Sequence, residues 1–377
     1  MSQENPLFKS YIGQDISYLG GKSIDEVTTQ VDKVYKLSSN ENPIGASPLA
    51  VKAIKEQAES LYLYPDRTDK KLCIALADYY EQILGPEHFF AANSGSESLE
   101  YIIRAFMGEG TECIFSTPGF SLYENLVNWV GGRSVVVPLI GDNHELDVNA
   151  ILDSVNAKTR LIFITSPNNP TGSYVKSHEL AYILDRVPDH VVVVYDEVYH
   201  LFADAPDYTT AMPFVAAQKQ VIGLNSFSKS FGLAGLRLGY FYTTPKLIRY
   251  IRGMTRPFLL NTLALKAGVA ALSDHSFIAD TVAVTKNGRE FLYKELEQLQ
   301  IKYWKSQGNF VLIKPPISSQ LLEKKLLEQG VMIRPVSNFG ADGCVRVTVG
   351  VPAANEAFIN ALKNALSSSV QEPAFLA

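Results

Sequence analysis

The sequence predicts an α/β protein whose large domain has a mainly parallel central sheet and is followed by a smaller α+β domain. Short apolar runs alternate with longer amphipathic stretches between about residues 45 and 270. This alternation is typical of strands that are buried on both faces of a parallel sheet. From about residue 275 the pattern changes to a long polar helix and isolated strands. The length of 377 residues also exceeds one typical core, which favours two domains.

Five apolar runs should form strands of the large sheet, namely 112–115, 134–137, 161–164, 191–194 and 221–224. The smaller domain should contain a helix over 280–299, a strand at 309–313, a helix over 319–329 and a strand at 344–348. We therefore expect an N-terminal arm with part of the small domain over 1–40, a large domain over 41–270 and a small domain over 271–377.

Composition excludes several classes of protein. The net charge is −5 and no Lys/Arg run occurs, so nucleic-acid binding is not expected. No apolar run approaches the roughly 20 residues that span a bilayer, and the polar N-terminus does not resemble a signal peptide. The three cysteines, Cys73, Cys113 and Cys344, lie far apart, which indicates neither a disulfide framework nor a metal site. A cytoplasmic protein without a metal or a membrane partner is the simplest interpretation.

Polar segments follow the predicted strands, where ligands bind in parallel α/β sheets. The segment 93–97 precedes a helical pattern, so its N–H groups and hydroxyls suit a phosphate, although taken alone it is better explained as an ordinary N-cap. The segment 165–172 contains two prolines and two asparagines. It is either a simple turn that ends the strand or a rigid support for an amide at this edge.

Two further strand ends carry charged groups. Asp196 follows an all-valine run, and such a carboxylate needs a partner unless it only caps a helix. Tyr199 would return to the same side after one helical turn, or it would pack in the core. Lys229 is flanked by Ser226 and Ser228. A lysine at the edge of a core is costly unless it is paired or neutralised.

Together these strand ends offer a phosphate cradle, an amide, a carboxylate and an amine. Pyridoxal 5′-phosphate uses all four, because its aldehyde binds a lysine amine and its ring nitrogen needs an acidic partner. Dinucleotide and phosphate-loop motifs fail, because the glycines that they require are missing. The cofactor's phosphate would be held by Ser94, Gly95, Ser96, Glu97, Ser226, Ser228 and Arg237.

Three segments resemble the signature of class I/II aminotransferases of the aspartate aminotransferase fold. They are TSPNNPTG at 165–172, DEVY at 196–199 and SFSKSFGLAGLR at 226–237, and they agree in order and spacing. Within that group nearly the whole chain resembles histidinol-phosphate aminotransferases, through the segments 18–27, 37–45, 64–66, 330–335 and 343–350.

The resemblance implies roles for residues around the cofactor. Lys229 would hold the cofactor as a Schiff base and act as the base, and Asp196 would pair with the ring nitrogen. Asn169 and Tyr199 would contact the phenolic oxygen, and Phe120, often Tyr in the family, would stack on the ring.

The resemblance also implies a second group of residues that bind the substrate or serve the other subunit. Tyr64 would reach the cofactor's phosphate in the neighbouring subunit, which implies a homodimer with shared active sites. Arg346 would bind the substrate's carboxylate or phosphate, with Arg334, Tyr18 and Asn42 in the same site.

The implied activity is a ping-pong transfer of an amino group between glutamate/2-oxoglutarate and histidinol phosphate/imidazole acetol phosphate. Two departures from the family pattern leave the identity of the substrate undecided. Leu259-Leu260-Asn261 stands where the family commonly has Asn-Val-Asn, and Ser96 stands where it commonly has an acidic residue. The alternatives are an aromatic amino acid aminotransferase, a threonine-phosphate decarboxylase and a cofactor-binding regulator. The regulator is disfavoured because no basic helix pair precedes the segment at 40–43.

Overall fold

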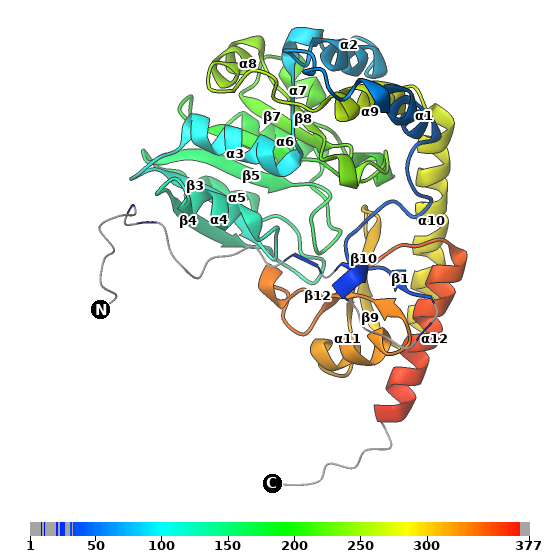
Figure 1. The fold of residues 1–377 in the computed structure, drawn as a ribbon. Helices are drawn as coiled ribbons and strands as arrows, with labels where there is room; N and C mark the ends of the chain where they lie inside the picture. The colour runs from blue at the N-terminus through cyan, green and yellow to red at the C-terminus, as the bar shows by residue number, and fades with distance from the viewer. Residues whose placement is uncertain are drawn as a thin grey trace.

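The computed structural model describes residues 9, 11, 20, 21, 23–26, 31 and 33–369. Its largest element is a seven-stranded sheet whose only antiparallel strand is β8, and which is flanked by helices on both faces (Figure 1). In spatial order the strands are β2 (Phe89–Ala92), β8 (Gly239–Tyr242), β7 (Val221–Ser226), β6 (Val192–Asp196), β5 (Thr159–Thr165), β3 (Glu112–Thr117) and β4 (Arg133–Pro138).

The five predicted strands of the large sheet are confirmed as β3 to β7. Strands β2 and β8 were not predicted. Strand β8 returns antiparallel directly after the segment that contains Lys229. The run FFAA of β2 ends in two alanines and the run GYFY of β8 begins with a glycine, and both residue types are depleted in strands.

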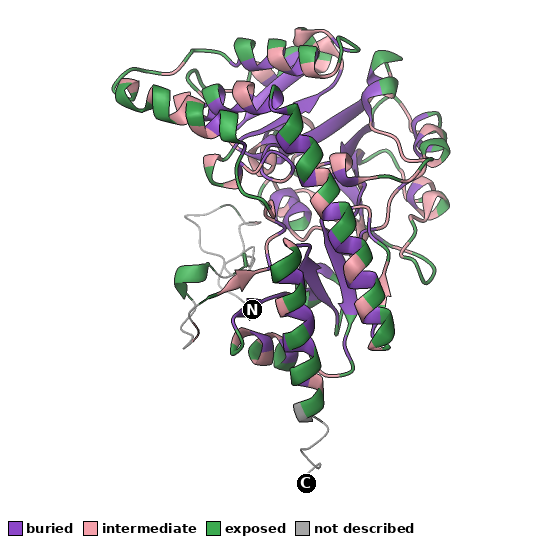
Figure 2. Cartoon of the chain, turned by 90° about the vertical axis from the view of Figure 1, so that its right-hand side faces the viewer, coloured by how far each residue is buried: buried purple, intermediate pink, exposed green. Residues whose placement is uncertain are grey.

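Two hydrophobic clusters fill the space between this sheet and its helices, and Figure 2 shows the strands buried beneath partly exposed helices. One cluster takes side chains from α1 (Pro48–Gln57), α2 (Lys70–Tyr79), α5 (Val148–Asp153), α6 (Ser177–Leu184), α7 (Met212–Ala216) and α9 (Thr262–Leu272). The other takes them from α3 (Gly95–Phe106), α4 (Leu122–Asn128) and α8 (Pro245–Arg252). Helices therefore cover both faces, as a mainly parallel sheet requires.

A four-stranded antiparallel sheet lies in the C-terminal part of the chain, beside the long helix α10 (Figure 1). Its order is β12 (Arg334–Pro335), β13 (Val345–Thr348), β10 (Phe310–Lys314) and β9 (Lys302–Trp304). The helices of this part are α10 (His275–Gln298), α11 (Ser319–Leu327) and α12 (Pro352–Ser369). The predicted strands and helices are confirmed, although α10 begins five residues earlier than expected.

A two-stranded sheet joins the N-terminal segment to the C-terminal part, because β1 (Tyr35–Lys36) pairs in parallel with β11 (Val331–Met332). This pairing supports our proposal that residues 1–40 contribute to the small domain. Short 3₁₀ helices complete the fold, namely η1 (Ile24–Glu26), η2 (Ala58–Ser60), η3 (Pro86–His88), η4 (His200–Phe202), η5 (Ala234–Leu236) and η6 (Ser337–Phe339). Within the described part of the chain, no helix is both long and apolar enough to cross a membrane.

Candidate active site

A cavity of about 610 Å³ lies where the carboxyl ends of β5, β6 and β7 meet the N-terminus of α3, the segment 38–41 and the small sheet. Most of the predicted site residues line it: Ser94, Gly95, Ser96, Phe120, Asn169, Asp196, Tyr199, Ser226, Ser228, Lys229, Arg237, Arg334 and Arg346. The ends of β5, β6 and β7 therefore meet at one cavity, as expected for a parallel sheet.

Three predicted residues do not line the cavity, and a fourth lies outside the described residues. The Glu97 carboxylate accepts a hydrogen bond from the Asn93 backbone N–H at 2.5 Å, so it caps α3 and does not line the cavity. Asn42 donates its amide to the carbonyls of Lys229 and Ser230, at 3.0 and 3.1 Å, and thus supports the lysine's backbone. Tyr64 is 83% exposed, and Tyr18 lies outside the described residues.

The Lys229 amine has an environment that favours its neutral form. Nζ donates to the Ser39 carbonyl at 3.0 Å, in a partly buried position. Loss of solvent, followed by the nearby charge of Arg346, lowers the pKa of Lys229 to about 7. Near neutral pH a large share of this amine is therefore unprotonated and can act as a nucleophile or a base.

Asp196 is the last residue of β6 and is 4% exposed. Burial raises the pKa of its carboxyl to about 6, while the Tyr123 hydroxyl, which donates to Oδ2 at 2.6 Å, lowers it. The group remains mostly ionised at neutral pH and can pair with a cationic ring nitrogen. Tyr123 was not predicted as a site residue, and its only local signal is its position three residues after Phe120 in the sequence.

One end of the cavity is suited to a phosphate. Helix α3 starts at Gly95, and Ser94, Gly95 and Ser96 at its N-terminus line the cavity. The hydroxyls of Ser226 and Ser228 and the guanidinium of Arg237 line the same cavity. A helix N-terminus, two hydroxyls and a guanidinium form a donor set that matches a dianion, so these residues fit the phosphate of pyridoxal phosphate.

Two arginines on strands of the small sheet, Arg334 on β12 and Arg346 on β13, form a second cationic group. The Arg346 side chain is buried and donates to Asn169 Oδ1 and to the Ser38 carbonyl, both at 2.6 Å. Arg334 donates to the Gly20 carbonyl at 2.7 Å. Strands β12 and β13 pair these two arginines directly opposite each other. The cavity can therefore present two guanidinium groups to an anionic substrate.

Two residues of the segment 38–41 were missed by sequence reasoning. The Asn40 amide donates to the Tyr199 hydroxyl at 3.0 Å and so orients that ring. Ser38 is 3% exposed and lines the cavity, and its hydroxyl has no hydrogen-bond partner among the residues that the structure describes. The family-like segment 37–45 contained both residues, but nothing local indicated that they would face the site.

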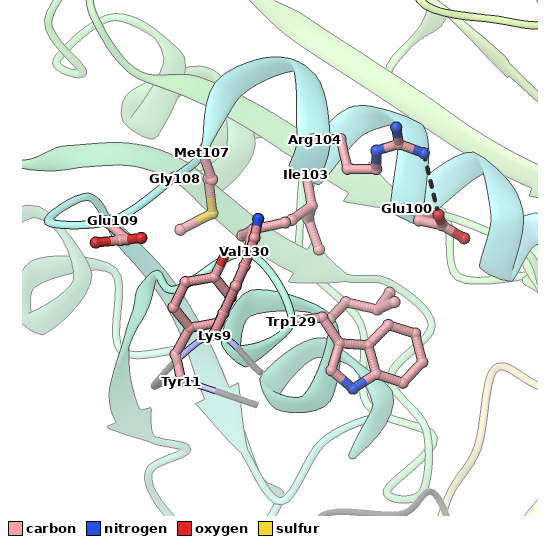
Figure 3. A pocket seen from close by; sticks show the side chains of 11 residues that line it. Lys9, Tyr11, Glu100, Ile103, Arg104, Met107, Gly108, Glu109, Trp129 and Val130 are labelled. Atoms are coloured by element: carbon pink, nitrogen blue, oxygen red, sulfur yellow. Dashed lines mark hydrogen bonds and ion pairs between the residues drawn. The ribbon is translucent and has the colours of Figure 1, made fainter. Parts of the chain in front are cut away.

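A separate pocket of about 540 Å³ lies between α3 and the end of α4 (Figure 3). Its lining includes Ile103, Met107 and Trp129, with an ion pair of 3.3 Å between Arg104 and Glu100 at its edge. None of the predicted site residues lines it. The cavity around Lys229 is therefore the better candidate for chemistry.

Comparison with known proteins agrees with this geometry. The model of the family "Aminotransferase class I and II" matches residues 32–362. A histidinol-phosphate aminotransferase of Carboxydothermus hydrogenoformans is 38% identical over 93% of this chain and 96% of its own.

Solved structures share the fold. A histidinol-phosphate aminotransferase of Sinorhizobium meliloti, solved with pyridoxal 5′-phosphate, superposes with a TM-score of 0.81 at 23% identity, over 89% of this chain and 92% of its own. A tetra mutant of the aspartate aminotransferase of Thermus thermophilus has a TM-score of 0.76 at 23% identity, over 92% of this chain and 98% of its own. The sequence match over most of the chain and the cavity at the strand ends lead to one conclusion: the protein belongs to the class I and II aminotransferases.

Proposed function

We propose that the protein transfers an amino group between glutamate/2-oxoglutarate and histidinol phosphate/imidazole acetol phosphate, with pyridoxal 5′-phosphate as cofactor. The observation that carries the proposal is the single cavity in which an amine with a lowered pKa, a buried carboxylate and two arginines meet. Several relatives of 36–38% identity, matched over 93% of this chain, bear the name histidinol-phosphate aminotransferase, which supports this substrate.

When bound, the cofactor supplies an aldehyde that takes up the amino group and a ring that accepts the electron pair released at the substrate carbon. Lys229 would attach to it, Asp196 would balance the charge of its ring nitrogen, and Phe120 would cover the ring. Asn169 and Tyr199 would donate to its phenolic oxygen. Its phosphate would lie at Ser94–Ser96, Ser226, Ser228 and Arg237.

Lys229 would also move the proton of the reaction once a substrate amine has displaced it. The pKa of about 7 allows its Nζ to accept a proton and to return it near neutral pH. Asn42, which holds the Lys229 carbonyl at 3.0 Å, keeps the backbone of this residue fixed while the side chain moves.

Arg346 and Arg334 would bind the anionic groups of the substrates. Glutamate carries an α-carboxylate, whereas histidinol phosphate has a phosphate and no α-carboxylate. A phosphate has more charge and more acceptor oxygens than a carboxylate, so it can use both guanidinium groups. The buried Ser38 hydroxyl at the same cavity offers an additional donor.

A screen of half-reactions tests this proposal against its rivals. The absorbance of the cofactor-loaded enzyme would be followed with histidinol phosphate, glutamate, aspartate, phenylalanine and tyrosine. Histidinol phosphate and glutamate should both convert the cofactor to its amine form, and a keto acid should restore the aldehyde. Turnover of phenylalanine, with no turnover of histidinol phosphate, would favour an aromatic aminotransferase. Release of CO₂ from threonine phosphate, with no need for a keto acid, would favour the decarboxylase.

The two arginines should contribute unequally to the two half-reactions. Arg346→Ala should damage both. Arg334→Ala should weaken the histidinol-phosphate half-reaction more than the glutamate one, by roughly 1.5–3 kcal/mol if a charged hydrogen bond is lost. The measurement is kcat/KM for each half-reaction by stopped-flow absorbance. Arg186→Ala, a surface arginine stacked at 3.4 Å on Tyr182, controls for loss of charge. Equal losses in both half-reactions would argue against phosphate recognition by Arg334.

We further propose a homodimer in which Tyr64 serves the cofactor's phosphate in the other subunit. The segment 61–64 supports this, because Leu61, Tyr62, Leu63 and Tyr64 are all exposed. Contiguous exposed apolar groups of this kind mark protein interfaces. Tyr64 also packs on Phe258 at a ring distance of 5.0 Å, which extends the apolar surface.

Mixed dimers test the shared site. Lys229→Ala and Tyr64→Ala should each be nearly inactive alone. Unfolding and refolding them together should restore about a quarter of wild-type activity, because half of randomly paired dimers are hybrids and one of their two sites is intact. Refolding each variant alone is the control. Absence of complementation, or an active monomer in sedimentation, would contradict the shared site.

A further inference from the structure

Directly after Asp196 lies a buried carboxylate that the proposed reaction does not use. Glu197 is 1% exposed and is not part of the cavity lining, since successive side chains of an extended chain point to opposite sides. Its carboxylate accepts hydrogen bonds from the Asn225 amide at 2.9 Å, from the Ala211 backbone N–H at 2.9 Å and from the Tyr242 hydroxyl. These donors come from three separate segments of the chain.

Two of the segments joined by Glu197 carry residues of the proposed cofactor site. Asn225 directly precedes Ser226 on β7, and Glu197 directly follows Asp196 on β6. The Tyr242 ring of β8 lies against the bare backbone of Gly223 on β7, where any Cβ would collide with it. One carboxylate thus connects β7 and β8 to the residue that follows β6.

Strand β8 connects this carboxylate to the phosphate cradle. At its first residue, Gly239, an added Cβ would collide with the backbone of Ser94 and Gly95, so β8 packs directly on the start of α3. The Cβ position of Gly95 in turn lies 3.8 Å from the Asn225 carbonyl oxygen and 3.9 Å from Ser226 Cβ. The cradle therefore rests on the same two strands that donate to Glu197.

We propose that Glu197 is a positioning residue that fixes the separation between the Asp196 carboxylate and the phosphate cradle at Ser94–Gly95 and Ser226. This inference rests on the proposed placement of the cofactor, whose ring nitrogen and phosphate would occupy these two ends. A rigid ligand held at both ends binds well only if the spacing of its two anchors is correct. Misplacement of a reacting group by about 1 Å can also lower the reaction rate about 10²-fold.

A role in stability alone explains the carboxylate less well. Burial raises the pKa of Glu197 to about 8, although its three hydrogen bonds lower it. Burying such a group costs free energy that hydrogen bonds offset only in part, so a buried acid is weak evidence for stabilisation. Its hydrogen bonds do, however, hold β6, β7 and β8 in one position relative to each other.

The test compares Glu197→Gln with Glu112→Gln. Glu112 is a carboxylate that is 3% exposed and is bonded to Arg133 at 2.6 Å and Asn156 at 2.9 Å, at the opposite end of the parallel strands. The dissociation constants of pyridoxal phosphate and of pyridoxal, which lacks the phosphate, would be measured on the apoprotein. The pH midpoint of the cofactor's absorbance and the thermal unfolding of the apoprotein would be measured as well.

Glu197→Gln should raise the dissociation constant of pyridoxal phosphate by about tenfold or more and shift the absorbance midpoint. The dissociation constant of pyridoxal should change by less than about threefold, because pyridoxal has no phosphate and uses only the Asp196 end of the site. The melting temperature should fall no further than in Glu112→Gln. Equal losses for both ligands, or unchanged binding of pyridoxal phosphate, would overturn the proposal.

A second variant keeps the proposal testable if Glu197→Gln does not fold. Tyr242→Phe removes one hydrogen-bond donor and leaves the carboxylate in place. It should therefore also raise the dissociation constant of pyridoxal phosphate, but by a smaller factor. Unchanged affinity and an unchanged midpoint in Tyr242→Phe would then overturn the proposal. Failure of the wild-type protein to bind pyridoxal phosphate would instead refute the proposed function.

Discussion

Replacing Lys229 with alanine should abolish amino-group transfer and leave the fold intact. The variant loses the amine that attaches the cofactor and the base that moves the proton, and loss of a general base alone costs about 10²- to 10⁴-fold. Pyridoxal phosphate should still bind non-covalently through Asp196 and the phosphate cradle. Reduction of the wild-type complex with borohydride, followed by peptide mapping, should place a pyridoxyl group on Lys229.

Lys219→Ala is the matched control for this experiment. Lys219 forms an ion pair of 2.7 Å with Asp185, and neither residue lines the cavity. Its replacement should leave covalent attachment and turnover close to wild type. A pyridoxyl group on any lysine other than Lys229 would contradict the assignment.

The pH dependence of attachment gives a second readout for Lys229. Because its pKa is lowered to about 7, the amine is mostly protonated below that pH and mostly neutral above it. Only the neutral amine attacks an aldehyde. The rate at which the apoprotein attaches pyridoxal phosphate should therefore rise as the pH increases through about 7. A rise that begins only near the ordinary lysine pKa of about 10.4 would show that the pocket does not perturb Lys229.

The sequence predicted the parallel part of the large sheet well, because each strand is a continuous apolar run buried on both faces. Both β6 and β7 are wholly buried. Asp196 is the last residue of β6, and Lys229 follows three residues after the end of β7. The position of Lys229 and Asp196 in one cavity follows from this regularity. Strands β2 and β8 escaped prediction because their runs, FFAA and GYFY, contain alanine and glycine, which carry little strand signal.

Side-chain partnerships across long stretches of sequence could not be predicted. Tyr123 meets Asp196 across 73 positions, and Tyr242 meets Glu197 across 45. The family resemblance placed Arg334 and Arg346 in one site, but not the antiparallel register of β12 with β13 that sets them opposite each other. Each of these contacts depends on how separate elements pack, so local pattern alone contains no signal for it.

Asp196→Asn should retain the cofactor and lose most of the transaminase activity. The amide has nearly the same shape, but it carries no charge to balance a protonated ring nitrogen, so the ring accepts the released electron pair poorly. We expect kcat to fall by at least about 10²-fold, which corresponds to about 2.7 kcal/mol of activation free energy. Single-turnover absorbance with glutamate measures this loss apart from cofactor binding.

Tyr123→Phe provides the graded comparison, because it removes the hydroxyl that donates to Asp196 Oδ2 and leaves the carboxylate. That hydrogen bond lowers the pKa of Asp196 against the larger opposing effect of burial, so its loss should raise the pKa above about 6. Cofactor affinity should weaken as the pH falls through the Asp196 pKa, and this midpoint should lie higher in Tyr123→Phe than in the wild type. At pH 8 the Phe variant should stay within about tenfold of wild type, since Asp196 is then ionised. Near-native activity of Asp196→Asn across the whole pH range would mean that Asp196 serves only to end β6.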